Sequence, residues 1–243
     1  MVEIKKDDWY ALLISGDEPR FAQESTYFQN FLTNEARFNP KNIRHIICTH
    51  HARDCILEGT QTFINLAKEL TDNPNILFLY NGHGRKGSFG GERNFFSIRT
   101  SLKYSRWAKL IRDCGKYIFI NDSCHSGSSI KAFEKQGLLP NKGMVITSSA
   151  TDELSCDWKF LNRLIKSYKN REPFTNKEIY EHELIGRIIL TSPKEELEDT
   201  ISAAFFDQKE ELFDKPIYSG TIQHPQKRGL PLEEILYSLK PQD

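Results

Sequence analysis

A histidine and a cysteine occupy corresponding positions in two segments of the chain, each just after a short apolar run. The run Ile76–Leu79 leads to His83, and the run Tyr117–Ile120 leads to Cys124. Glycine follows closely in both segments, which is typical of tight turns at the ends of strands. Because the carboxyl ends of neighbouring parallel strands meet at one edge of a sheet, we expect the thiol and the imidazole to lie together there.

A thiol beside an imidazole is suited to nucleophilic attack on a carbonyl carbon. The thiolate is the reactive form, and only about a few per cent of an ordinary thiol is ionised at about pH 7. We therefore predict that His83 activates Cys124 by acid–base help, which contributes about 10²–10⁴-fold to a rate. A helix that begins beside Cys124 would favour the thiolate further through its dipole. The backbone N–H groups of Gly84 and Cys124 are predicted to stabilise the oxyanion, an effect of roughly 10²–10³ in rate.

Two simpler interpretations compete with this one. Cys124 could be an inert buried thiol, which is the usual fate of a cysteine outside a disulfide. The neighbouring His125 could be the base, but side chains of adjacent residues at a strand end tend to diverge. The glycines around both motif residues favour the pairing of His83 with Cys124.

The composition is that of an ordinary globular protein. The 243 residues are 38% hydrophobic and 27% charged, and 33 basic residues balance 33 acidic ones. This length favours one large α/β domain, and no strongly basic face or arm indicates nucleic-acid binding. No apolar run is long enough to span a membrane, and the charged segment Met1–Asp8 lacks the apolar core of a secretory leader.

The five cysteines show no disulfide framework, since their number is odd and their spacing irregular. This pattern predicts free thiols and a reducing, cytoplasmic setting. Cys48, His50, His51 and Cys55 lie close in sequence, but their spacing does not match the usual zinc-binding patterns. We predict a strand end that runs into a polar loop at this position rather than a metal site.

The other patterns predict strands that alternate with helices. Apolar runs predict strands over 9–14, 43–48, 76–80, 117–121, 143–148 and 216–219. Helical spacing predicts helices over 21–38, 57–70, 107–111, 126–136, 158–168, 175–184 and 194–205. The alternation is typical of α/β proteins, here with a mostly parallel central sheet of about six strands and helices on both faces. The glycine-containing segment 84–100 is predicted to be an exposed loop near the motif residues.

Both motifs resemble those of metacaspases and related caspase-like cysteine peptidases. Asp122–Gly127 is similar to their catalytic cysteine motif, and Asn81–Gly84 is similar to their catalytic histidine motif, which usually begins with serine. Weaker similarity extends over 9–14, 144–153 and 223–226.

The resemblance implies a caspase-like three-layer sandwich and endopeptidase activity. It implies a single peptidase domain over 1–243, with a p20-like part (1–130) that carries the Cys-His dyad and a p10-like part (140–243). The dyad of His83 and Cys124 would hydrolyse peptide bonds through a thioester acyl-enzyme.

The resemblance also implies a preference for Arg or Lys at the P1 position of the substrate. In metacaspases an acidic residue two positions before the nucleophile helps to form the P1 pocket, and Asp122 holds that position here. Glu24 is the nearest counterpart of a second acidic pocket residue, although it could instead be a solvated helix residue. Asn81 shapes the same pocket. Carboxylates bind a guanidinium through paired, charge-assisted hydrogen bonds.

Two alternatives stay open. The Gln-Ala-Cys-x-Gly motif of caspases is absent, yet a caspase-like peptidase with Asn or Asp specificity remains a candidate. A catalytically latent or pseudoprotease-type regulatory scaffold is the alternative from another class of protein.

Calcium dependence is not expected. Calcium-requiring relatives carry acidic clusters after the histidine and after the nucleophile, whereas Arg85–Arg93 has one acidic residue and Lys131 follows Cys124.

We predict no cofactor, a protein or peptide substrate, and regulation by an activating partner protein, a ligand or self-cleavage. Basic residues that could be cleaved lie in or near predicted loops at Lys135, Lys142, Lys169 and Arg171.

Overall fold

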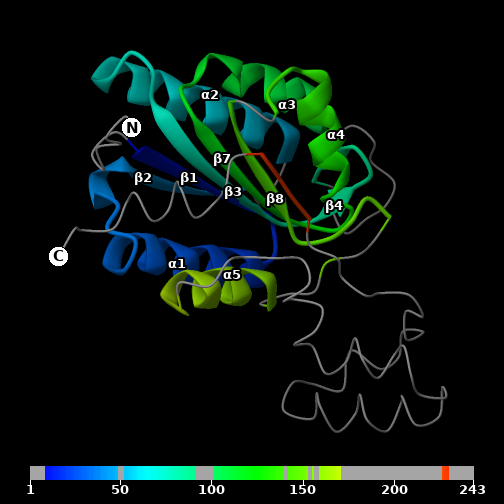
Figure 1. Cartoon of the computed structure of the whole chain (residues 1–243), viewed down its shortest axis with the longest axis horizontal. Coiled ribbons are helices and arrows are strands. Elements are labelled where there is room, and N and C mark those ends of the chain that lie inside the picture. The colour runs from blue at the N-terminus through cyan, green and yellow to red at the C-terminus, as the bar shows by residue number, and fades with distance from the viewer. Residues whose placement is uncertain are drawn as a thin grey trace, which may run out of the picture.

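A mostly parallel sheet of six strands forms the centre of the molecule in this computed structural model (Figure 1). The structure describes residues 9–48, 52–90, 101–139, 142–152, 155, 159–170 and 226–229. The strands are β1 (Trp9–Ser15), β2 (Ile43–Ile47), β3 (Asn75–Asn81), β7 (Tyr117–Asp122), β8 (Gly143–Thr147) and β9 (Gln226–Gly229). Their order is β2-β1-β3-β7-β8-β9, and within it only β9 pairs antiparallel to its neighbour.

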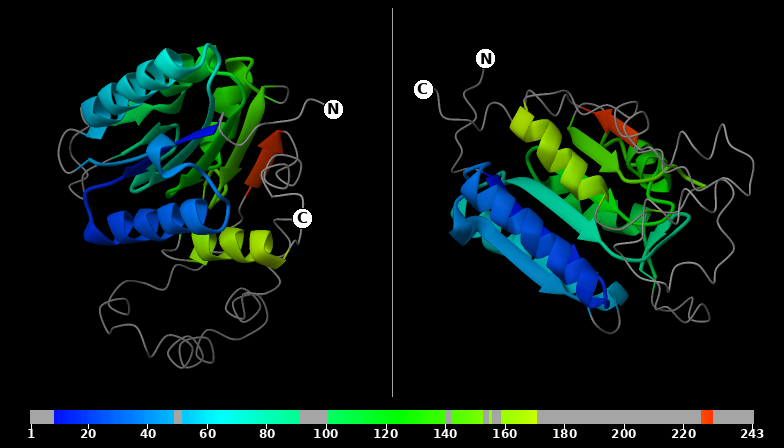
Figure 2. Two further views of the ribbon diagram at one scale, coloured as in Figure 1. Left: turned by 90° about the vertical axis from the view of Figure 1, so that its left-hand side faces the viewer. Right: turned by 90° about the horizontal axis from the view of Figure 1, so that it is seen from below.

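Helices cover both faces of this sheet. They are α1 (Pro19–Asn34), α2 (Ala52–Leu70), α3 (Tyr104–Leu110), α4 (Ser128–Lys135) and α5 (Lys159–Asn170). Figures 1 and 2 show α2, α3 and α4 on one face and α1 with α5 on the other. The predicted three-layer α/β architecture with a mostly parallel sheet is therefore confirmed.

Two cores lie on the two faces, because successive residues of a strand point to opposite sides of the sheet. The core on the α1 and α5 face includes Leu13, Leu77, Leu79, Ile118, Ile120, Phe28, Phe31 and Leu164. The core on the α2, α3 and α4 face includes Leu12, Ile76, Phe78, Phe119, Phe63, Trp107 and Phe133. Strands that are buried on both faces have continuous apolar runs in their sequence, and these strands could therefore be predicted.

A small second sheet, which the sequence did not predict, follows β3. It is antiparallel and consists of β4 (Gly84–Arg85), β5 (Ser88–Phe89) and β6 (Leu102–Lys103). Phe89 is buried and packs against the rings of Tyr80, Tyr104, Trp107 and Phe119. The prediction of an exposed loop is thus wrong for its first part, because this aromatic cluster anchors the hairpin; residues 91–100 lie outside the described residues.

Several predicted elements cannot be compared. The helices over 175–184 and 194–205 and the strand over 216–219 lie outside the described residues. Strand β9 was not predicted; it extends the sheet beside β8. Among the described helices, none is both long and apolar enough to cross a lipid bilayer.

Candidate active site

The two motif residues leave the sheet at matching positions. Strands β3 and β7 are parallel neighbours, and Asn81 is the register partner of Asp122. His83 lies two positions after Asn81, and Cys124 lies two positions after Asp122, so both are at the carboxyl edge of the sheet. The predicted adjacency of the two strands is confirmed, and it brings the two loops together although the histidine and the cysteine are 41 positions apart in sequence.

The loop that carries the histidine packs directly against the loop that carries the cysteine. A Cβ atom on Gly84 would lie 2.5 Å from Ser123 Oγ and closer still to the carbonyl oxygen of Cys124. On the other side of His83, a Cβ on Gly82 would lie 3.2 Å from the Cα of Gly16. The glycines of the histidine motif therefore permit close backbone approach on both sides, a role open only to residues without a side chain.

Two hydrogen bonds fix the backbone of His83. Its carbonyl oxygen accepts from the hydroxyl of Tyr80 at 2.7 Å and from the N–H of Gly90 at 2.9 Å. Tyr80 is buried, and this burial raises the pKa of its hydroxyl well above the ordinary value. The hydroxyl therefore stays protonated and remains a donor to His83.

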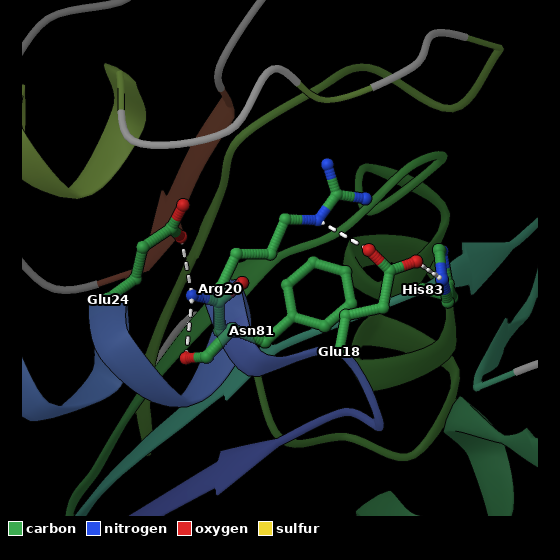
Figure 3. Close-up of polar contacts among 6 residues, drawn as sticks. Glu18, Arg20, Glu24, Asn81 and His83 are labelled. Carbon is green, nitrogen blue, oxygen red and sulfur yellow. Dashed lines mark hydrogen bonds and ion pairs between the residues drawn. The ribbon is translucent and has the colours of Figure 1, made fainter. Parts of the chain in front are cut away.

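The imidazole of His83 is held by Glu18, which directly precedes α1, and by residues of the first turn of α1 (Figure 3). Its Nε2 lies 2.7 Å from Oε1 of Glu18, and Oε2 of Glu18 lies 2.7 Å from Nε of Arg20. The ring of Phe21 meets the imidazole edge to face, with centroids 5.2 Å apart. Sequence reasoning missed Glu18 and Arg20, although their position just after the first predicted strand would have placed them at the same sheet edge.

Cys124 is half-buried and lies outside any disulfide. Its sulfur accepts a hydrogen bond from the backbone N–H of Ser155 at 3.4 Å. Helix α4 starts at Ser128, after a series of turns. Cys124 thus lies four positions before the first residue of α4, and the expected effect of the helix dipole on its thiol stays a prediction.

His125 takes a backbone conformation that is uncommon for a residue with a side chain. Its φ is +58°, in the left-handed region. The conformation is held by its carbonyl, which accepts from Oγ of Ser128 at 2.7 Å, and by its Nδ1, which lies 3.1 Å from the carbonyl oxygen of Thr151. The turn after Cys124 thus stores local strain, a feature that clusters at functional sites.

A network of serine hydroxyls fixes the cysteine loop to the segment after β8. Oγ of Ser149 donates to the carbonyl of Ser123 at 3.1 Å, and the N–H of Ser149 donates to Oγ of Ser126 at 3.0 Å. All three serines are buried. Buried and bonded polar groups of this kind hold a loop in one geometry.

The three predicted P1-pocket residues lie in one row. Asn81 Nδ2 donates to Oε2 of Glu24 at 2.6 Å (Figure 3), and Asn81 shares its face of the sheet with its register partner Asp122. Glu24 and Asp122 are only 1% and 4% exposed, so the reading of Glu24 as a solvated residue is wrong. Oδ1 of Asp122 accepts from Oγ of Ser155 at 2.8 Å. Ser155 therefore touches both Cys124 and Asp122; no sequence signal had singled it out.

No family model and no curated protein matches the sequence. Among solved structures, the chain is similar to caspase-1 from Spodoptera frugiperda, with 14% identity, a TM-score of 0.44, and coverage of 68% of this chain and 70% of that one. It is also similar to a secreted C11 cysteine protease from Bacteroides thetaiotaomicron, with 7% identity, a TM-score of 0.37, and coverage of 58% and 48%. A third similar structure is Raptor from Chaetomium thermophilum, with 13% identity, a TM-score of 0.43, and coverage of 73% and 19%.

The prediction of free thiols is wrong for two cysteines. Cys48 and Cys55 form a disulfide that joins the end of β2 to the first turns of α2, where their Cα atoms are 5.8 Å apart, a separation that suits the bond. Cys114 is a buried thiol whose pKa is raised to about 11 by desolvation.

Within the part of the chain that the structure describes, no group of three or more His, Cys, Asp or Glu residues could hold a metal ion. His50 and His51 lie outside that part.

Proposed function

We propose that the chain is a cysteine endopeptidase in which Cys124 is the nucleophile and His83 is the general acid and base. The observation that carries the proposal is the pairing of Asn81 with Asp122. Because of this pairing, the two motif loops begin next to each other at the ends of neighbouring strands. The contact of Gly84 with the backbone of Cys124 supports it, because it fixes the two loops against each other.

The proposed reaction has two stages. His83 takes the proton of the Cys124 thiol, and the thiolate attacks the carbonyl carbon of the substrate. The resulting imidazolium gives its proton to the leaving amine as the C–N bond breaks, which leaves a thioester. His83 then takes a proton from water, whose oxygen attacks the thioester, and the thiolate departs as the acid product forms. The thiolate finally regains a proton from His83.

The oxyanion of each tetrahedral intermediate would be stabilised by backbone N–H groups. The donors proposed are those of Gly84 and Cys124, which come from the two contacting loops. The left-handed turn at His125 and the serine network below it hold the nucleophile loop in one geometry. Donors that are fixed before the reaction need no reorganisation as charge develops.

The proposed P1 preference is for Arg or Lys. The two carboxylates of Glu24 and Asp122 are buried at the same end of the sheet, with Asn81 between them. A buried site with two carboxylates complements a cationic side chain, and a guanidinium can use paired hydrogen bonds there. Charge complementarity therefore favours basic over acidic P1 residues.

A panel of fluorogenic peptides with Arg, Lys, Asn and Asp at P1 tests the proposal. The wild-type chain should cleave the Arg and Lys members, and Cys124→Ala should cleave none. Cys114→Ala is the matched control, because it removes a buried thiol of raised pKa that lies away from the motif loops. Failure of the wild-type chain to cleave any member would contradict the proposal and favour the regulatory scaffold.

A further inference from the structure

We infer that Glu18 is a positioning residue for His83: its carboxylate holds the imidazole in the tautomer that can take the proton of Cys124. The inference rests on the proposed function and adds a third residue to the pair. It comes from the contact of Glu18 with Nε2 of His83, which joins residues 65 positions apart in sequence.

The direction of the hydrogen bond follows from the chemistry of the two groups. An ionised carboxylate can only accept, so Nε2 of a neutral His83 must carry the hydrogen that lies between them. The proton of the neutral ring is then on Nε2, and Nδ1 holds the lone pair. Among the two ring nitrogens, Nδ1 is therefore the one that can act as base toward Cys124.

The carboxylate is itself fixed on its second oxygen. Arg20 contacts Oε2 of Glu18 at 2.7 Å, which leaves Oε1 directed at His83. The guanidinium carbon of Arg20 also lies 4.9 Å from the ring centre of Phe21, and that ring packs edge to face on the imidazole. Arg20, Glu18, His83 and Phe21 thus form a closed set of contacts that includes the imidazole. Figure 3 shows the chain of Arg20, Glu18 and His83.

This arrangement differs from an ordinary surface ion pair. The Glu18 side chain is only 19% exposed and that of His83 only 28% exposed, whereas exposed pairs contribute little because solvent screens them. A carboxylate in this position also stabilises the imidazolium that forms when Cys124 loses its proton. Groups that orient a reacting imidazole in this way act on the chemical step rather than on substrate binding.

Kinetics of the full-length chain test the inference on the best substrate of the P1 panel. We expect Glu18→Gln, which keeps the shape of the side chain, to lower kcat by about 10- to 100-fold, less than the full acid–base contribution of about 10²–10⁴, while KM stays within about twofold. Glu35→Gln is the matched control, because Glu35 pairs with Lys169 on the surface at 3.0 Å, away from the motif loops. It should leave kcat unchanged.

A spectroscopic measurement separates this inference from the proposed function. In ¹⁵N-histidine-labelled Cys124→Ala, where no thiolate can pair with the ring, long-range ¹H–¹⁵N spectra at alkaline pH should show His83 in the Nε2–H form. Comparison with Cys124→Ala,His83→Asn assigns its signals. Adding Glu18→Ala should convert these signals to a mixture of the two tautomers, and this result does not depend on any peptidase activity.

Two outcomes would overturn the inference. One is an Nε2–H population of His83 that Glu18→Ala leaves unchanged. The other is a kcat of Glu18→Gln that equals or exceeds that of the wild type in an active enzyme, which would mean that Glu18 is neutral toward His83 or restrains it. By contrast, a wild-type chain that cleaves no peptide but shows the predicted spectra would contradict only the proposed function.

Discussion

Gly84 and Cys124 are in backbone contact, so close that even a methyl group on Gly84 would collide with the carbonyl oxygen of Cys124. Parallel pairing of β3 with β7 brings the two loops to one sheet edge, but pairing alone does not determine how the loops face each other. The contact provides that constraint, and it links the geometry of the nucleophile loop to the histidine loop.

We expect Gly84→Ala to damage both stability and activity. The added Cβ meets backbone and Ser123 rather than the end of a flexible side chain, so we expect a loss of about 1–3 kcal/mol in the free energy of unfolding, as is usual for overpacking. Cleavage of a P1-Arg peptide should fall at least about tenfold under conditions where the variant is folded, because both oxyanion donors shift. Denaturant unfolding and steady-state kinetics measure the two effects.

Gly87→Ala is the control for Gly84→Ala, because it strains the backbone of the same hairpin without adding a contact with Cys124. Gly87 has a φ of +84°, and a Cβ there would meet no atom within 4 Å. Its replacement should cost about 1–2 kcal/mol through the left-handed backbone while leaving kcat/KM near the wild-type value. Equal losses of activity in the two variants would argue against a specific role of the Gly84 contact.

Asp122→Asn should remove the preference for basic P1 residues. A hydrogen bond to a charged group contributes about 1.5–3 kcal/mol, so kcat/KM for a P1-Arg peptide should fall by about 10- to 200-fold. A P1-Gln peptide should be cleaved no more slowly than by the wild type. Asp152→Asn is the matched control, since Asp152 is exposed and paired with Lys86. If the control loses as much P1-Arg activity as Asp122→Asn, Asp122 does not determine specificity.

His45 should make stability depend on pH in the mildly acidic range. Its Nε2 lies 2.7 Å from Oγ of Ser15, and burial lowers the pKa of the imidazole below its ordinary value. Protonation therefore favours the unfolded chain, so the stabilisation is complete above about pH 6.5 and is lost as pH falls through the lowered pKa. Thermal unfolding of wild type and His45→Gln over a pH series tests this. Parallel decreases in Tm in both proteins would show that His45 contributes nothing.

Calcium should be dispensable for peptide cleavage. The segment after His83 presents Arg85 and Lys86, and the side chain of Lys86 is paired with Asp152; cationic side chains repel a divalent cation. Activity on a P1-Arg peptide should be the same with and without excess EGTA. Complete loss with the chelator, restored by added calcium chloride, would refute the prediction.

The fold could be predicted where local pattern decides the structure. Strands β1, β3 and β7 are buried on both faces, and their apolar runs gave their positions within a residue or two. The hairpin of β4 and β5 could not be predicted, because each strand has two residues and no periodicity. Its formation depends on Phe89 packing against Tyr80 and against two rings more distant in sequence, those of Trp107 and Phe119.

The candidate site shows the same division between local and long-range information. His83 and Cys124 could be found because each lies in a short motif after a strand. Ser155 could not, because it reaches Cys124, 31 positions away, only after the sheet has assembled. For Glu18, the end of the first predicted strand indicates its place at the sheet edge but not its contact with His83, which lies 65 positions away. The disulfide of Cys48 and Cys55 was missed because the odd number of cysteines pointed to thiols.

Covalent labelling tests the central claim most directly. A peptidyl acyloxymethyl ketone with Arg at P1 reacts with an activated thiol at a peptidase site, and intact-mass and peptide mass spectrometry locate the adduct. We predict one adduct per chain on Cys124, none in Cys124→Ala, and labelling of His83→Ala slowed by at least about 100-fold. Labelling of a different cysteine, or equal rates in wild type and His83→Ala, would contradict the account.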